Sequence, residues 1–307
     1  MTDHVPVLTV EAVRYLQAEH GGVFVDCTVG LGGHTRALIE AGATHVIGLD
    51  RDADALALAS IKLAPWKDRV ELVHADYRAI EEVLDARHIS VVDGTLADLG
   101  VSSLQLNGPG RGFSFQRDEP LDMRMDRSRG DTAADLLARS TEREIADAVF
   151  AFGEERFSRR IARAVVERRR TEPITTTGQL ASIVRRAIPR SGAASRSRTG
   201  RGRGHARTDP ATRTFQALRV WVNRELEDLD RFLHAAVRRL RAGARLVVIT
   251  FHSLEDRIVK HTLRALERGS DATVRVLTKK PIVPGEDEIR QNPRARSAKL
   301  RAAERLA

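Results

Sequence analysis

Three apolar segments in the first hundred residues each end near an aspartate, and the first of them runs into a glycine-rich turn. The segments are residues 23–27, 45–50 and 91–99, and the aspartates are Asp26, Asp50 and Asp98. The turn covers residues 30–34, and a helical pattern follows at 35–41. Strands that alternate with helices predict right-handed crossovers and a parallel sheet. Because ligands of such sheets bind beyond the carboxyl ends of the strands, the pattern predicts a nucleotide-type cofactor pocket.

The alternation of strands and helices continues on both sides of a long interruption. Further helices are predicted at 10–18 and 52–64, and further strands at 70–75, 245–250 and 274–277. Between the fourth and fifth strands about a hundred residues lack this alternation, which is too long for one connection. An ordered loop is predicted at 108–130, followed by helical segments to residue 187. The sequence therefore predicts a mostly helical domain, residues 108–210, inserted into an α/β domain.

Local signals add four expectations about the ends of elements. Thr177 is expected to cap a helix at 179–188, since threonine is a good helix N-cap. Residues 211–240 are expected to form one long amphipathic helix, which Gly243 ends. Ser253 has the spacing of a capping box for the next helix. The basic tail at 292–307 is expected to be loosely held.

Composition narrows the class of protein. The 307 residues are 42% hydrophobic and 30% charged, as in globular proteins, and the formal net charge of +9 predicts a polyanionic partner such as nucleic acid. Cys27 is the only cysteine, which excludes an intramolecular disulfide and a cysteine-based zinc cluster, and no metal site is predicted. Because no apolar run approaches about 18 residues and no signal peptide is recognisable, the protein is expected to be cytoplasmic with no membrane segment.

The segment 190–207 differs from the rest of the chain. It holds six arginines among glycine, serine and alanine, with no acidic residue. Such a segment cannot bury enough apolar surface to order itself, so it is predicted to be disordered in the free protein. Two interpretations stay open: an arm that folds on RNA, or a solvated linker.

Several long motifs, taken in order, resemble one family. They lie at residues 26–35, 98–105, 111–115, 120–126, 152–155, 210–219 and 250–257. Together they resemble the bacterial RsmH (MraW) proteins, which are S-adenosylmethionine-dependent methyltransferases acting on a cytidine N4 amine in the decoding (P-site) region of 16S rRNA. The resemblance implies a class I, Rossmann-like fold with seven strands, in which 1–107 and 211–307 form the methyltransferase domain. It assigns substrate recognition to the inserted domain and suggests a homodimer.

The resemblance also implies which residues bind the cofactor, S-adenosylmethionine. They are Gly32, Gly33, His34, Asp50, Tyr77, Asp98 and Gln105. Physical roles suit most of them: the turn allows close approach, Asp50 can accept both ribose hydroxyls, and Tyr77 can stack on adenine. The cofactor carries a sulfonium cation, so nearby carboxylates such as Asp26 and Asp98 are electrostatically favourable.

Two residues are candidates for catalysis. Methylation of a cytidine N4 needs in-line attack and a hydrogen-bond acceptor for the amine proton, because the nitrogen lone pair is delocalised into the ring. Asp98 is the first candidate for that acceptor, and the alternative is a carboxylate that caps the following turn. His252, after the fifth strand, is predicted to orient the base or to accept the proton, and its alternative role is structural. Methylation at C5 would need a thiolate, and Cys27 looks like an ordinary small buried residue.

Other motif residues are better explained by substrate binding or by packing. Met123 and Met125, with Phe113 and Phe115 upstream, either line the entry for a flipped base or pack onto the protein. Exposed arginines could contact phosphates, and the candidates are Arg111, Arg124, Arg156, Arg159 and Arg160. Asp209 stands where many relatives are expected to carry histidine, so no role of that histidine is transferred.

The expected substrate form is the assembled 30S subunit, because RNA recognition commonly relies on shape and the chain has no repeated sequence-reading module. Other classes of function remain open. A small-molecule N- or O-methyltransferase would work without RNA, and a non-catalytic ribosome-assembly binder would use the pocket only to sense the cofactor. A nicotinamide dehydrogenase is a further alternative, although it gives no reason for the motif at 98–103.

Overall fold

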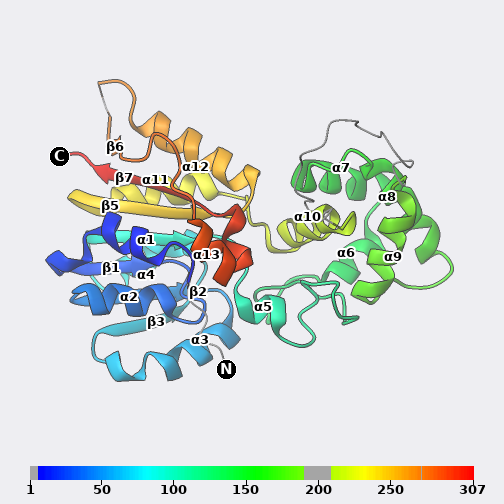
Figure 1. The fold of residues 1–307 in the computed structure, drawn as a ribbon, viewed down its shortest axis with the longest axis horizontal. Helices are drawn as coiled ribbons and strands as arrows, with labels where there is room; N and C mark the ends of the chain where they lie inside the picture. Colours follow the sequence, from blue (N-terminus) through cyan, green and yellow to red (C-terminus); the bar gives the residue numbers. More distant parts are fainter. Residues whose placement is uncertain (1–5, 190–208, 271) are drawn as a thin grey trace. The chain divides into compact units, whose positions relative to one another are not determined.

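A seven-stranded sheet forms the centre of the α/β part of the computed structural model, which describes residues 6–189, 209–270 and 272–307 (Figure 1). The strands lie in the order β3-β2-β1-β4-β5-β7-β6. Their bounds are β1 Val23–Asp26, β2 His45–Asp50, β3 Val70–His74, β4 Val92–Asp98, β5 Leu240–Thr250, β6 Val274–Val276 and β7 Lys299–Arg305. β1 to β5 pair in parallel, whereas β7 is antiparallel to both β5 and β6. The predicted α/β, class I methyltransferase fold is confirmed.

The strand order brings the three aspartates to one edge of the sheet. β1 pairs with β2 on one side and with β4 on the other, so the direction of winding reverses between β1 and β4. Asp26 is in register with Leu96, two residues before Asp98. Asp26, Asp50 and Asp98 are the last residues of β1, β2 and β4. Because parallel strands end at the same edge of a sheet, all three lie at the edge where the winding reverses. Ligands of open α/β sheets bind at such a position.

Alternation along the strands separates two apolar layers. Val25 and Leu246 belong to a core cluster with α4 (Ile80–Asp85), α11 (Leu229–Arg238) and α12 (Ser253–Leu266). Phe24 and Val247 belong to another, with α1 (Thr9–Leu16) and α2 (Gly33–Ala41). Successive side chains of a strand point to opposite faces, so the two clusters cover the two faces of the sheet. The same unit contains α3 Ala53–Lys62, α13 Glu286–Gln291 and the short 3-10 helices Ala18–His20, Ala64–Trp66, Tyr77–Ala79 and Pro293–Ser297.

The chain divides into two units by its internal packing. The first consists of Met1–Leu104 with Leu226–Ala307, and the second of Gln105–Glu225. The helices of the second unit are α6 Ala133–Arg139, α7 Glu142–Gly153, α8 Ser158–Arg169, α9 Thr177–Ala187 and α10 Ala211–Asn223, and α5 Ser103–Asn107 crosses its boundary. Helices α6 to α10 lie together in Figure 1, and their buried apolar residues belong to one core cluster. The second unit therefore runs beyond the predicted 108–210 at its carboxyl end.

Helix α10 explains the shifted boundary. Its residues Phe215 and Leu218 are buried in the same cluster as Val149 of α7 and Leu180 of α9. The sequence analysis placed residues 211 onward in the α/β domain, because an amphipathic helix shows that it has a partner without showing which one. Residues 211–225 belong to the helical unit.

The prediction of a single helix at 211–240 is wrong. Arg224 and Asp228 adopt left-handed backbone conformations, with φ of 50° and 55°, and the helix breaks between them. α10 ends at Asn223 and α11 begins at Leu229, and each buries its apolar residues in a different core cluster. Gly243 does not end a helix, because it lies within β5.

Two predicted helix caps are each displaced by one residue. Thr176, not Thr177, caps α9, and its hydroxyl accepts from the backbone N–H of Gln179 at 3.3 Å. His252, not Ser253, caps α12. In both places the capping-box partner lies three residues beyond the true cap, as that motif requires.

The expectation of a loosely held tail at 292–307 is also wrong. β7 lies between β5 and β6 and pairs with both. Its Arg301 is buried and donates to Asp256 of α12, with Nε 2.7 Å from Oδ1. This ion pair lets a strand with several basic residues occupy the interior of the sheet.

The predicted disordered segment at 190–207 lies outside the described residues. Within the described part of the chain, no helix is both long enough and apolar enough to cross a membrane.

Candidate active site at the carboxyl edge of the sheet

The glycine-rich turn after β1 is held against the end of β2. Gly30 has a φ of 52°, and its N–H donates to Oδ2 of Asp50 at 2.7 Å. Gly32 has a φ of 84°, and a Cβ there would lie 2.8 Å from a methyl carbon of Leu63. Glycine is therefore needed at position 32 for both backbone conformation and space. The turn and Asp50, which the sequence predicted to act together, are in direct contact.

Asp50 is a buried acceptor with an altered acidity. Its Oδ1 accepts from the N–H of Asp52 at 2.8 Å, and its Oδ2 accepts from Gly30. Burial raises the pKa of Asp50 to about 6, although these two backbone hydrogen bonds act in the opposite direction. Each carboxylate oxygen has two lone pairs, so both can still accept hydrogen bonds from hydroxyl groups.

The side chains of His34 and Asp98, both predicted site residues, are in contact. Nε2 of His34 lies 3.3 Å from Oδ2 of Asp98, and the His34 side chain is only 4% exposed. Oδ1 of Asp98 is buried and has no hydrogen-bond partner among the described residues, and the same is true of Nδ1 of His34. Unpaired buried polar atoms are uncommon in folded proteins and occur at functional sites. A carboxylate acceptor with a free oxygen therefore stands at the end of β4.

Asp26 supports the site through hydrogen bonds beneath the glycine-rich turn. It is fully buried, and its Oδ2 accepts from the hydroxyl of Thr35 at 2.6 Å while its Oδ1 accepts from the N–H of Thr28. The hydroxyl oxygen of Thr28 in turn accepts from the N–H of Asp98 at 2.6 Å. Asp26 thereby links the turn, the start of α2 and the end of β4. The roles of Thr28 and Thr35 were not predicted from the sequence. Their position on either side of the glycine-rich turn could have indicated them.

The pKa values of His34 and Asp26 are set by burial and by neighbouring charges. Burial by itself would lower the pKa of His34, but the carboxylates of Asp98, Asp26 and Glu288 outweigh it and raise that pKa. Burial raises the pKa of Asp26, and His34 partly opposes this rise. Glu288 of α13, whose carboxylate also accepts from the N–H of Leu8 at 2.7 Å, was missed because nothing in the sequence connects it to His34.

Three other predicted cofactor residues lie in different surroundings. Tyr77 is almost buried and packs against Phe232, with ring centroids 4.7 Å apart. Gln105 is a buried residue of α5, at the beginning of the second unit. Gly33 opens α2 and packs against Pro6. The ligand contacts of Tyr77, Gln105 and Gly33 stay predictions.

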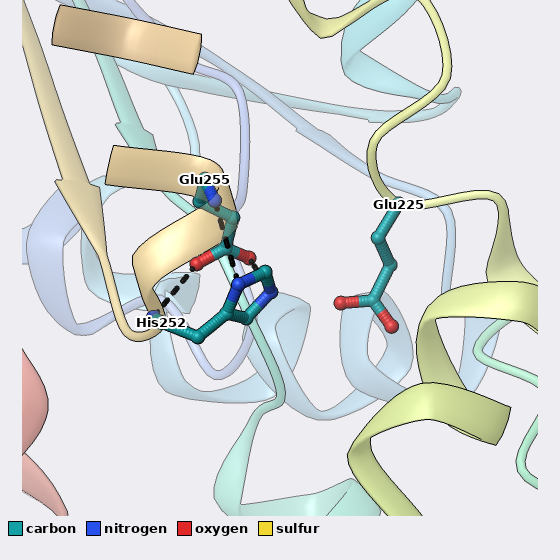
Figure 2. Close-up of side chains that lie close together, drawn as sticks. All are labelled: Glu225, His252 and Glu255. Atoms are coloured by element: carbon teal, nitrogen blue, oxygen red, sulfur yellow. Dashed lines mark hydrogen bonds and ion pairs between the residues drawn. The ribbon is translucent and has the colours of Figure 1, made fainter. Parts of the chain in front are cut away.

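His252 is held by the helix that it caps. Its Nδ1 accepts from the N–H of Glu255 at 3.4 Å, and its Nε2 lies 3.1 Å from Oε1 of Glu255 (Figure 2). Oε2 of Glu255 accepts from the N–H groups of Phe251 and His252. An imidazole that accepts at Nδ1 carries its hydrogen on Nε2, where it acts as a donor. This geometry favours the structural alternative for His252, and its catalytic role stays a prediction. Glu225, the third residue in Figure 2, belongs to the second unit and binds Arg219 there.

Cys27 is unsuited to nucleophilic attack. Its side chain is 2% exposed within the core beneath the sheet's carboxyl edge. Burial raises the pKa of the Cys27 thiol well above its usual range, and the charges of Asp26 and Asp76 add to the rise. A thiol in this environment is rarely ionised, so the residue serves packing.

The motif at 111–126 is packed inside the second unit. Met123 is fully buried in that unit's core, where Phe115 packs edge-on against Phe215. Asn223 accepts from the N–H of Met125 and donates to the carbonyl of Met123. These contacts favour the packing alternative over a base-entry role for the methionines.

The arginines proposed for phosphate binding fall into two groups. Arg111 is buried and donates to the carbonyls of residues 124 and 125, and Arg124 binds Asp122, so both serve the fold. Arg156, Arg159 and Arg160 are exposed. Only the second group remains available for phosphate.

Asp209 has a structural role of its own. Its carboxylate receives Nη2 of Arg185 at 2.8 Å and the N–H of Ala211 at 2.8 Å. It thus ties the end of α9 to the beginning of α10.

Comparison with known proteins identifies the family of the chain. The family model described as "MraW methylase family" matches residues 1–306. A protein of Sorangium cellulosum named ribosomal RNA small subunit methyltransferase H is 50% identical, covering 99% of this chain and 91% of its own. The protein of that name from Geotalea uraniireducens is 45% identical, covering 99% and 98%. A solved rRNA methylase of Streptococcus thermophilus aligns over 100% of this chain and 99% of its own, at 11% identity and a TM-score of 0.42. With the family model and close relatives spanning nearly the whole chain, the protein belongs to the MraW methylase family.

Proposed function

We infer that the protein transfers a methyl group from S-adenosylmethionine to N4 of a cytidine in the decoding (P-site) region of 16S rRNA, on the assembled 30S subunit in the cytoplasm. The observation that carries this inference is the unpaired, buried Oδ1 of Asp98 at the carboxyl end of β4. The names of the relatives, which specify small-subunit ribosomal RNA, support the substrate class.

The residues at the carboxyl edge fit the cofactor. Asp50 offers two carboxylate oxygens for a ribose, and Gly30 and Gly32 give the turn the left-handed backbone conformations that glycine adopts readily. Asp98 adds negative charge toward a sulfonium cation, which a carboxylate stabilises. Gln105 and Tyr77 are included among the proposed cofactor-binding residues, as the family resemblance implies. S-adenosylmethionine, when bound, supplies an electrophilic methyl group.

Asp98 is the proposed proton acceptor of the reaction. Its free Oδ1 would hold the amine of the cytidine by a hydrogen bond, direct the nitrogen lone pair toward the methyl group and take up the amine proton. His34 holds the other oxygen, at 3.3 Å, so the carboxylate is fixed before substrate arrives. Fixed acceptors of this kind need no reorganisation during the reaction. His252 is kept as a second candidate, acting as a hydrogen-bond donor from Nε2 that orients the base.

Methylation of nitrogen is preferred over methylation of the ring carbon. Attack by cytosine C5 requires a cysteine thiolate that first adds to the ring. Cys27 is the chain's only cysteine, and it is buried with a raised thiol pKa. Direct attack by the exocyclic amine needs only an acceptor, which Asp98 provides.

The proposal is tested by supplying methyl-labelled S-adenosylmethionine to the protein with 30S subunits, free 16S rRNA or a metabolite extract. N4-methylcytidine, identified by nucleoside mass spectrometry and formed only with 30S subunits, is the expected result. Label in free rRNA would overturn the substrate form. Label in metabolites alone would indicate a small-molecule methyltransferase, and tight cofactor binding without any transfer would indicate a ribosome-assembly binder.

A further inference from the structure

The outer face of α12 carries a row of basic side chains. Lys260, His261 and Arg264 lie on α12 and Arg268 lies two residues beyond its end; together they are here called the basic stripe, in which Lys260, Arg264 and Arg268 are spaced four residues apart. Such spacing places side chains on one side of a helix. His261, Arg264 and Arg268 are exposed and Lys260 is half-buried. Lys260 and Arg264 lie about 6 Å apart along the helix axis, at 1.5 Å per residue.

The acidic residues of the same helix are all engaged elsewhere. Glu255 is buried and accepts from the N–H groups of Phe251 and His252. Asp256 binds Arg301 of β7. Glu267 accepts from the N–H of Val276 at 2.8 Å. No carboxylate of α12 forms an ion pair with a residue of the basic stripe.

Neighbouring elements do not neutralise it either. No ion pair joins Lys260, His261, Arg264 or Arg268 to any residue of the described ranges. Lys260 and Arg264 are four residues apart on α12, and like charges at this spacing destabilise a helix. An external anion that bridges them would relieve this repulsion. Arg257, also on α12, already has a partner within the protein and is not part of the stripe.

The position of α12 connects the stripe with the candidate active site. The helix begins directly after β5, whose Ile249 is in register with Asp98. α12 therefore starts at the carboxyl edge of the sheet and leads away from it. Its apolar residues Val259 and Leu263 are buried in the core, so this face of the helix has no apolar surface to insert into a bilayer. A row of exposed cations on a helix that starts at the edge of the candidate active site fits a phosphate backbone.

We propose that the basic stripe of α12 binds phosphates of the substrate RNA at a place separate from the target nucleotide. The proposal rests on the proposed function for the identity of its partner. Contacts of this kind set the position of the RNA and add affinity without reading its sequence. They release counterions, so their contribution weakens as salt concentration rises.

The test compares two variants that lose equal charge. One is Lys260→Gln with Arg264→Gln and Arg268→Gln. The control removes three exposed cations elsewhere in the same unit, by Arg14→Gln, Lys62→Gln and Lys67→Gln. Binding of a polyuridine oligonucleotide is measured over a range of salt concentrations, and methyl transfer to 30S subunits is measured at limiting and saturating subunit concentrations.

The stripe variant is expected to lower the slope of log affinity against log salt by about 2, since each lost single-strand contact removes about 0.7. Its KM for 30S subunits should rise while kcat and S-adenosylhomocysteine affinity stay unchanged, and its Tm should not fall. The control should keep the wild-type slope. An unchanged slope in the stripe variant, or an equal change in the control, would overturn the proposal.

The two proposals can fail separately. If the wild-type protein binds polyuridine through the stripe but transfers no methyl group to 30S subunits, the proposed function fails and the stripe stands as an RNA-binding surface. If the wild-type protein methylates 30S subunits and the stripe variant does so with the same KM, only the stripe proposal is wrong.

Discussion

Nε2 of His34, at the start of α2, lies 3.3 Å from Oδ2 of Asp98, at the end of β4. Both residues lie beside the point where the sheet reverses its direction of winding, since β1, which leads into His34, pairs with β4. The imidazole occupies one carboxylate oxygen and leaves the other, Oδ1, unpaired among the described residues. This pair is the centre of the proposed mechanism, because it fixes an acceptor where a reacting amine would lie.

The His34–Asp98 pair should make stability depend on pH. The pKa of His34 in the folded protein lies above the ordinary value of 6.5. Folding therefore favours the protonated imidazole, and this stabilisation is complete below pH 6.5 and is lost as pH rises through the raised pKa. We expect the difference in unfolding free energy between wild type and His34→Gln to shrink as pH rises from 5 to 9. Urea denaturation at each pH measures it, with the exposed His234→Gln as control, and a difference that grows with pH would contradict the pairing.

Asp50 should make cofactor affinity depend on pH in the opposite direction. Its pKa in the free protein is raised to about 6 by burial, so the carboxyl group is protonated below that pH. Ribose hydroxyls donate more strongly to the ionised form, so affinity for S-adenosylhomocysteine should fall as pH drops below about 6. Asp50→Ala should weaken binding by about 10-fold to 100-fold, the value of a hydrogen bond to a charged group. Calorimetric titration measures both effects, and a wild-type affinity that is flat from pH 5 to 8 would exclude the assigned role.

Two substitutions of His252 can distinguish its helix-capping role from a catalytic role. His252→Ala removes the cap of α12 and should lower stability by about 1 kcal/mol, whereas His252→Asn keeps a good cap. If the imidazole also orients the base, both variants should lose turnover while keeping cofactor affinity. Thermal unfolding and methyl transfer measured on the same samples separate the two roles. Full turnover in His252→Asn would show that the residue only caps the helix.

Cys27 should be dispensable for the reaction. Cys27→Ala leaves a small cavity under the edge of the sheet and should cost about 1 kcal/mol of stability. Because the buried thiol takes no part in attack by an amine, the rate of methyl transfer should stay within a few-fold of wild type. Loss of activity in a variant that remains folded, judged by circular dichroism, would reopen the thiolate route to C5.

The elements that could be predicted from the sequence are those with a local signal. The strand at 45–50 was predicted with the bounds that β2 has, because an apolar run ends at an acidic residue. β7 was missed, because its Arg301 looks exposed until Asp256 is brought beside it from 45 positions away. The break between α10 and α11 was missed for a related reason: Arg224 and Asp228 adopt left-handed conformations without a glycine to indicate them.

The candidate site was predictable to the same extent. Asp50 and Gly30 were expected to act together, because strand ends and glycine turns recur at cofactor sites. Glu288 could not be foreseen, since it reaches the surroundings of His34 only through the folded position of α13. His252 was singled out as a lone histidine after a strand, but its bond to the N–H of Glu255 depends on where the helix begins.

Asp98→Asn offers the most direct test of the central claim. The substitution keeps the shape of the side chain but removes a general base, which typically contributes about 10²-fold to 10⁴-fold to the rate. Single-turnover transfer from labelled S-adenosylmethionine to 30S subunits, with the product nucleoside identified by mass spectrometry, measures it. We predict N4-methylcytidine from the wild-type protein and a rate at least about 100-fold lower from Asp98→Asn at saturating cofactor. A different methylated nucleoside, or a variant as fast as wild type, would contradict the account.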